Sequence, residues 1–280
     1  MSGPVRLDDT SVWVHEQGSG YPIIVLHGGP GLDHHAFGSY LDPLADRFRL
    51  LLVDQRGQGR SEPVGLETFT LPRLAQDVIM IARALGLERY AVLGHSFGAF
   101  VALQNAVDYP GMASQVVLCG GVPSARFFRA VERNLAELEP AEVRGRIEAA
   151  LEREAQARSP DEFAAFVREV MPFHFADPTD ARIEEYLTET GGTIYTPDVH
   201  HRSATMRSIE VEDRLADVAA PVLAIVGRHD RSCIYAASKA IADGVLQGEL
   251  ALFDHSGHMP FVEEPERFRA EISGFLDRHP

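Results

Sequence analysis

The stretch Gly94-His95-Ser96-Phe97-Gly98 constrains the fold of this chain more than any other. It follows an apolar run at 90–93 and precedes residues 97–108, whose composition is typical of a helix. A G-x-S-x-G pattern between a strand and a helix forms a sharp turn that exposes the serine hydroxyl above the end of a sheet. Its glycines leave room for neighbouring backbone. We therefore predict that Ser96 is a catalytic nucleophile.

Short apolar runs alternate with helical patterns on both sides of this turn. Several runs are rich in Val, Ile and Leu without polar alternation, as in strands that are buried on both faces. Such an alternation favours an α/β fold with a parallel or mostly parallel central sheet flanked by helices. The predicted strands are residues 12–15, 22–26, 49–54, 90–93, 115–119, 222–226 and 250–253.

The alternation stops between residues 123 and 210. This stretch keeps a helical periodicity and has almost no strand pattern. The sequence Ser159-Pro160-Asp161-Glu162 is a capping box with proline at the first helical position, which predicts that a helix begins there. A second helix is expected over 178–190, ended by the glycines at 191 and 192. We interpret residues 123–210 as a helical cap, or lid, and residues 1–122 together with 211–280 as the core.

The net charge of the chain limits the classes of partner that it can bind. It holds 26 Lys and Arg against 41 Asp and Glu, a formal net charge of −15. Nucleic acid and anionic membranes repel such a chain, so we expect neither as a partner. No apolar run approaches the ~20 residues of a membrane span, and the first residues lack the apolar core of a signal peptide. A cytoplasmic protein, monomeric or a small homo-oligomer, is expected, with Cys119 and Cys233 as buried thiols.

A serine hydroxyl needs a base to take its proton, and the base needs an acid to orient it. When the nucleophile lies on a turn of this kind, the acid and then the histidine follow it along the chain. Asp230 leaves the predicted strand 222–226, and His258 leaves the next one. We therefore predict Asp230 as the acid and His258 as the base. The alternatives are Asp254 or Asp213 for the acid and His255 for the base.

Acyl transfer also needs N–H donors for the developing oxyanion, and one such donor is worth about 3–4 kcal/mol. The backbone N–H of Phe97, directly after the nucleophile, is the first candidate. The second should come from the loop after an early strand, here His27-Gly28-Gly29-Pro30-Gly31. We assign it to Gly29, with Gly28 as the alternative. The glycine spacing matches neither a G-x-G-x-x-G motif nor a P-loop, so a nucleotide is not expected.

Adjacent histidines occur at His34-His35 and at His200-His201. Zinc proteases instead place two histidines four residues apart on a helix, and adjacent side chains do not easily share one ion. We therefore expect no metal ion and no cofactor. His34 follows the oxyanion loop and is a candidate substrate-binding residue, as is Met259 beside His258.

Four motifs together resemble the α/β-hydrolase superfamily and, within it, the proline iminopeptidase-like branch. They are HGGPG at 27–31, DQRGQGRS at 54–61, GHSFG at 94–98 and SGH at 256–258. The first two are fairly specific to that branch, and the resemblance covers about residues 20–122 and 212–278. It implies the α/β-hydrolase fold with a substrate-selecting helical cap inserted after the sixth strand. It also implies the triad Ser96, Asp230 and His258, an oxyanion hole from Gly29 and Phe97, and no cofactor.

Two residues depart from the proline iminopeptidase pattern. Arg231 follows the predicted acid, where an acidic residue often helps to hold the free amino group of the substrate, and it would repel an ammonium group if it faced the pocket. Phe97 stands where a tryptophan is common. Within the cap, Glu184, Glu185 and Glu189 are the candidates for binding such an amine.

We therefore predict a cofactor-independent serine hydrolase that cleaves a small ester, lactone or amide through an acyl-enzyme. One alternative is an aminopeptidase that releases N-terminal proline from short peptides. The other is a non-catalytic ligand receptor built on the same scaffold.

Overall fold

The computed structural model describes residues 2–201, 205 and 208–280, and these include one eight-stranded sheet. Its strand order is β1-β2-β4-β3-β5-β6-β7-β8. The pairs β1–β2 and β2–β4 are antiparallel, and every other neighbouring pair is parallel. The mostly parallel sheet predicted from the sequence is confirmed. The strands are β1 (Gly3–Arg6), β2 (Ser11–Gln17), β3 (Tyr21–Leu26), β4 (Phe48–Asp54), β5 (Ala91–His95), β6 (Gln115–Cys119), β7 (Val222–Gly227) and β8 (Gly248–Phe253).

Strand β1 is absent from the strands predicted from the sequence. Its four residues alternate between partly buried and exposed side chains at the edge of the sheet. A strand this short and this polar carries little hydrophobic pattern, so its pairing with β2 is set by tertiary structure.

Successive residues of the central strands face two separate hydrophobic cores, because side chains alternate across a sheet. Ile24 and Val92 pack into one core, and their neighbours Ile23 and Leu93 pack into the other. The first core also receives α1 (Leu71–Ala84), α2 (Phe97–Asp108) and α8 (Tyr235–Gly244), and the second receives α9 (Pro260–Glu263) and α10 (Pro265–Arg278). Burial on both faces explains why the strands show no polar alternation.

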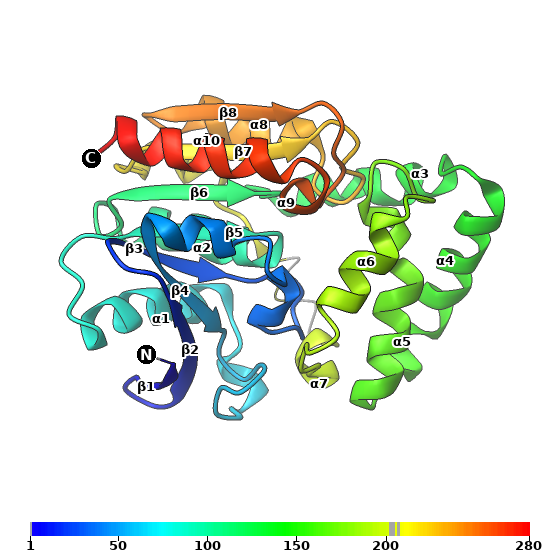
Figure 1. Ribbon diagram of the computed structural model, residues 1–280, viewed down its shortest axis with the longest axis horizontal. Coiled ribbons are helices and arrows are strands. Elements are labelled where there is room, and N and C mark those ends of the chain that lie inside the picture. The colour runs from blue at the N-terminus through cyan, green and yellow to red at the C-terminus, as the bar shows by residue number, and fades with distance from the viewer. Residues whose placement is uncertain (1, 202–204, 206–207) are drawn as a thin grey trace.

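Between β6 and β7 the described residues form helices and no strand, and we call residues 123–210 the helical insertion. In Figure 1 these helices lie beyond the carboxyl ends of the parallel strands. An isolated bridge pairs Ser124 with Glu210, so the two ends of the insertion lie side by side. Its α-helices are α3 (Arg129–Ala136), α4 (Ala141–Arg153), α5 (Pro160–Val170), α6 (Arg182–Glu189) and α7 (Pro197–His200).

Within the insertion, the residues at which helices begin depend on local capping interactions. The predicted capping box at Ser159 and Glu162 is confirmed at the beginning of α5. The helix expected over 178–190 begins later, at Arg182. Asp177 and Asp180 accept backbone N–H groups two residues further on, and these turns compete with helix formation.

None of the described helices is both long enough and apolar enough to cross a bilayer.

Candidate active site

Ser96 lies at the turn between β5 and α2. It has φ +53° and is the only non-glycine residue with positive φ in the described part of the chain. A Cβ on Gly94 would lie 2.2 Å from the Gly98 carbonyl oxygen, so the turn needs a glycine there. A Cβ on Gly98 would meet the Leu26 carbonyl oxygen at 2.2 Å. Strained backbone held by such packing is common at active sites, and this turn has the geometry of a nucleophile elbow.

Asp230 and His258 are in direct contact. His258 Nδ1 lies 2.7 Å from Asp230 Oδ2, and both side chains are buried. Asp230 Oδ1 accepts the backbone N–H groups of Ser232 and Cys233 at 2.9 and 2.8 Å. Because an ionised carboxylate only accepts hydrogen bonds, the proton between the two side chains is on His258 Nδ1. The neutral ring then has its lone pair on Nε2, the atom that a general base uses.

Gly120 and His95 determine where the His258 ring lies. Gly120 has φ +64°, and a Cβ on it would lie 2.8 Å from His258 Cε1, where it would displace the imidazole. His95 Nε2 donates to the His258 carbonyl oxygen at 2.9 Å. Burial, together with the nearby His258 ring, lowers the pKa of His95 well below its usual value, so His95 is neutral at pH 7. His95 therefore supports the loop by hydrogen bonding.

Ser96 and His258 line the same two cavities. The smaller cavity has a volume of about 160 Å³ and is also lined by Leu32, Phe163 and Met259. The larger cavity has a volume of about 560 Å³ and extends among α3, α4 and η6 (Met171–His174) of the insertion. In the described part of the chain the His258 ring hydrogen-bonds Asp230, and no hydrogen bond joins it to the Ser96 hydroxyl. Catalytic hydrogen bonds are often long in a free enzyme and shorten once substrate binds.

The loop 27–31 brings backbone N–H groups close to Ser96. A Cβ on Gly28 would lie 3.3 Å from Ser96 Cβ, and Gly29, with φ +115°, lines both cavities. Phe97 is the first residue of α2, where a helix leaves its N–H groups without internal partners. Both predicted oxyanion donors therefore lie next to Ser96, and the choice of Gly29 over Gly28 stays a prediction.

The motif at 54–61 supports the oxyanion loop from the core. Gln58 Oε1 accepts the Gly31 N–H at 2.6 Å. Gln55 Nε2 donates to the His27 carbonyl oxygen at 2.8 Å. Buried amide side chains that satisfy backbone groups in this way limit the conformations open to a loop.

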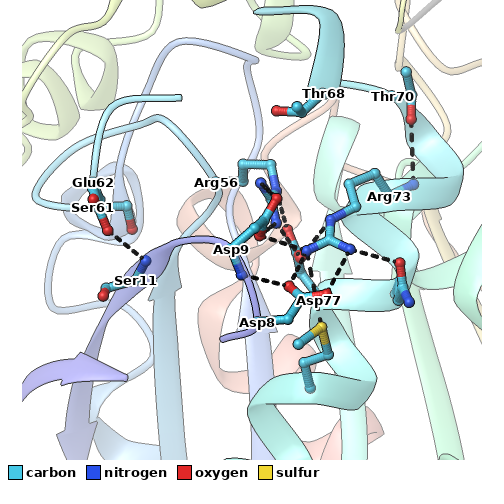
Figure 2. Close-up of polar contacts among 12 residues, drawn as sticks. Asp8, Asp9, Ser11, Arg56, Ser61, Glu62, Thr68, Thr70, Arg73 and Asp77 are labelled. Carbon is cyan, nitrogen blue, oxygen red and sulfur yellow. Dashed lines mark hydrogen bonds and ion pairs between the residues drawn. The ribbon is translucent and has the colours of Figure 1, made fainter. Parts of the chain in front are cut away.

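Arg56 anchors the same motif to α1 and to the turn between β1 and β2. Its buried guanidinium donates to both carboxylate oxygens of Asp77 at 2.7 and 2.8 Å, and to those of Asp9 at 2.8 and 3.1 Å. Arg73 adds bonds to Asp8 and Asp9, as Figure 2 shows. We call Asp8, Asp9, Arg56, Arg73 and Asp77 the Arg56 cluster.

Of the two predicted substrate-binding residues next to the catalytic motifs, only Met259 lines a cavity with Ser96. His34 borders a separate polar cavity of about 450 Å³, and its Nδ1 is hydrogen-bonded to the buried carboxylate of Asp54. His34, the first residue of the 3₁₀-helix η1 (His34–Phe37), therefore lines a cavity whose described lining does not include Ser96.

The three glutamates predicted to bind an amine lie away from the Ser96 cavities. Glu184 and Glu185 are exposed on α6, and Glu184 pairs with Arg168. Glu189 is also exposed and borders the polar cavity beside His34.

The structure instead brings two other acidic residues of the insertion to the larger cavity. They are Glu132 on α3 and Glu154 in η5 (Glu154–Gln156). Glu154 Oε1 lies 2.8 Å from His200 Nε2, and His200 Nδ1 lies 3.1 Å from the Pro30 carbonyl oxygen. Neither residue was predicted as a site residue, because no local spacing in the sequence marks them and only the packing of the helices brings them to one cavity.

Arg231 does not face the cavities, despite its place next to Asp230. Its guanidinium donates to the carbonyl oxygens of Phe175 and, at 3.0 Å, of Ala176. The guanidinium of Arg231 therefore does not line the Ser96 cavities, and we do not expect it to repel a substrate ammonium group there.

One group of described residues has the spacing needed to hold a metal ion. Ligand atoms of Asp33, His34 and His35 lie within 4.8 Å of one another. His35 Nδ1 is bonded to Asp33 at 2.9 Å, and His34 is bonded to Asp54. His34 and His35 border the polar cavity, whose described lining does not include Ser96.

Residues 21–265 match the family described as alpha/beta hydrolase fold. The match covers most of the chain, which therefore belongs to this family. The fold and the site define its class as a hydrolase with a serine nucleophile.

Within that class the chain is similar to proline iminopeptidases over nearly its whole length. It is 28% identical to the proline iminopeptidase of Clostridium botulinum over 277 residues, which cover 94% of this chain and 92% of the relative. The proline iminopeptidase structure from Mycobacterium smegmatis superposes with a TM-score of 0.77 at 27% identity, covering 100% and 98% of the two chains. An esterase from Exiguobacterium antarcticum gives a TM-score of 0.80 at 20% identity, covering 99% of this chain and 100% of the esterase, and shares the fold.

Proposed function

We propose that the protein hydrolyses a small amide or short peptide with a free amino group at its N-terminal residue, proline above all, through an acyl-enzyme on Ser96. The observation that carries the reaction class is that His258, hydrogen-bonded to Asp230, lines the same cavities as the strained Ser96. The similarity to proline iminopeptidases supports the choice of substrate.

In the proposed reaction His258 Nε2 takes the proton from the Ser96 hydroxyl as its oxygen attacks the scissile carbonyl carbon. The backbone N–H groups of Gly29 and Phe97 bind the oxyanion that forms. His258 then gives the proton to the leaving amine, and the carbon–nitrogen bond breaks. A water molecule, activated by the same imidazole, hydrolyses the ester to Ser96. Asp230 holds His258 in the required tautomer throughout.

Glu132 and Glu154 support a substrate that carries an amine. Both line the larger cavity together with Ser96. Glu154 pairs there with His200, and Arg129 is the one Lys or Arg in the described lining, so the two carboxylates outnumber it. A carboxylate within about 4–6 Å stabilises a cationic group. Helices α3 and α4, which border this cavity, belong to the insertion, and we propose that residues 123–210 act as the substrate-selecting cap.

Turnover of proline 2-naphthylamide tests the proposal, with N-acetyl-proline 2-naphthylamide as the matched substrate that lacks the amine. We expect the free-amine substrate to be cleaved at least tenfold more efficiently. Glu132→Gln and Glu154→Gln should raise KM for proline 2-naphthylamide and leave p-nitrophenyl acetate hydrolysis unchanged. Equal rates with the acetylated substrate would show that no amine is recognised.

Hydrolysis of an ester or lactone is the second candidate, and the smaller cavity favours it. Apolar side chains, among them Phe163, Val170 and Met259, dominate its lining, and no carboxylate contributes to it. Such a cavity suits an uncharged acyl group. Activity on p-nitrophenyl acetate and a lactone panel, without activity on proline 2-naphthylamide, selects this candidate.

A receptor without catalytic activity is tested by covalent labelling. A fluorophosphonate reacts with an activated serine, so the wild-type chain should be labelled and Ser96→Ala should not. Labelling that persists in Ser96→Ala would place the nucleophile elsewhere. Cytoplasmic location and a monomer or small homo-oligomer remain predictions from the sequence.

A further inference from the structure

Glu263, the last residue of α9, has a buried carboxylate that neither the sequence motifs nor the proposed reaction uses. Its Oε1 accepts the backbone N–H of Ala176 in the insertion at 2.7 Å. Its Oε2 accepts the backbone N–H of Gly257, the residue before His258, at 2.8 Å. One carboxylate therefore joins the insertion to the loop that carries the histidine.

The insertion also contacts this loop directly. The His258 N–H donates to the His174 carbonyl oxygen at 2.6 Å. A Cβ on Gly257 would lie 2.5 Å from that same carbonyl oxygen and 2.8 Å from the Ala176 nitrogen. The backbone at 174–176 therefore packs against residues 257 and 258 with no side chain between them.

Two arginines strengthen the same junction. Arg231 donates to the carbonyl oxygens of Phe175 and Ala176. Arg182, the first residue of α6, donates to the Glu263 carbonyl oxygen at 2.6 Å. Donors from the core and from the insertion thus hold both sides of the contact, and the Glu263 carboxylate lies between them.

We propose that Glu263 is a positioning residue for His258, because its carboxylate holds residues 174–176 of the insertion and the loop at 257–258 in one fixed arrangement. The inference rests on the proposed function only in taking His258 as the base, and it holds for an amide or an ester substrate alike. Glu263 does not touch the reacting atoms.

Replacing Glu263 with glutamine should disturb this arrangement. The amide keeps one oxygen acceptor, but its NH₂ group then faces an N–H donor of Ala176 or Gly257, and two donors repel. The histidine loop must move to relieve the contact. A displacement of about 1 Å in a catalytic group can lower a rate by about a hundredfold.

The test compares Glu263→Gln with Glu266→Gln. Glu266 is exposed at the start of α10, where its partner is Arg269, so it undergoes the same chemical change outside the junction. We expect kcat of Glu263→Gln to fall about 10- to 100-fold, KM to stay within about twofold, and the rate of fluorophosphonate labelling to fall in parallel. Glu266→Gln should match the wild type in all three measurements.

Urea unfolding of each variant gives its folded fraction, and kcat is expressed per folded molecule. If Glu263→Gln does not fold, Glu263→Asp replaces it, since its shorter side chain cannot reach both N–H groups and the same fall in kcat is expected. Wild-type kcat and labelling in the folded variant would overturn the inference. A wild-type protein that cleaves only esters overturns the proposed substrate instead, and the comparison is then made with p-nitrophenyl acetate.

Discussion

The Arg56 cluster and the junction at Glu263 are two buried polar contacts that join distant parts of the chain in different ways. Arg56 meets two carboxylates, Asp9 and Asp77, in paired hydrogen bonds. Glu263 meets two backbone N–H groups, those of Ala176 and Gly257. In the first contact carboxylates compensate the charge of a guanidinium. In the second, backbone N–H dipoles compensate the charge of a carboxylate.

The pKa values of Arg56 and Glu263 reflect this difference. Burial by itself lowers the pKa of Arg56, but its hydrogen bonds to Asp77 and Asp9 raise it above the usual value, so the guanidinium stays charged. Burial raises the pKa of Glu263 to about 7, although the N–H groups of Ala176 and Gly257 act in the opposite direction. The Arg56 guanidinium is therefore charged, although burial raises the pKa of its partner Asp77, while Glu263 titrates near neutral pH.

The largest effect on stability should come from Arg56→Met. Removing the guanidinium leaves Asp77 buried without its main partner, and breaking a buried ion pair in this way costs about 3–5 kcal/mol. Urea unfolding of the variant should show this loss of unfolding free energy. The kcat per folded molecule should stay within a few fold of wild type, because no cluster residue lines the Ser96 cavities and Arg56 reaches the oxyanion loop only through the motif at 54–61. A change below about 1 kcal/mol would mean that the pair contributes little.

A smaller effect is expected from the titration of Glu263. Its pKa is 4.5 in the unfolded chain and about 7 in the folded one, so between these values the folded state binds more protons. The unfolding free energy should therefore fall as pH rises from 4.5 to 7, by about 3 kcal/mol if the whole shift is realised. Urea unfolding at several pH values should show a flatter dependence for Glu263→Gln. Parallel curves for variant and wild type would contradict the raised pKa.

The smallest effect is expected at the rim of the Arg56 cluster. The Asp8 side chain is 51% exposed where it pairs with Arg73, and exposed pairs contribute about 0–1 kcal/mol. Asp8→Asn should therefore lower the unfolding free energy by less than 1 kcal/mol, and 0.5 M NaCl should remove much of the difference. If Asp8→Asn lost as much unfolding free energy as Arg56→Met, the exposed rim of the cluster would contribute as much stability as its buried centre.

The sequence predicts the fold well because the fold depends on local patterns, and the prediction of the candidate triad rests on the same patterns. Each apolar run marks a strand, and residues just after the strands gather at one edge of a parallel sheet. Ser96, Asp230 and His258 were predicted from this rule and from their order along the chain. Asp230 and His258 are in contact, and Ser96 lines the same two cavities as His258.

Residues whose position depends on helix packing could not be predicted in this way. Glu132 and Glu154 come from different elements of the insertion, and no sequence spacing relates them. His34 follows the oxyanion loop closely in sequence, yet its bond to Asp54 keeps it in another cavity. Gly257 packs against the His174 carbonyl oxygen, a contact between the core and the insertion that no local pattern in the sequence indicates.

The direct packing of residues 174–176 on residue 257 also limits how this enzyme can be re-engineered. The ends of the insertion lie side by side at Ser124 and Glu210, which makes them obvious points for exchanging it with the insertion of a relative. Such a chimera would replace His174 and Ala176 while keeping Gly257 and Glu263. A working graft must therefore retain the native backbone at 174–176, or exchange the stretch 256–263 along with it.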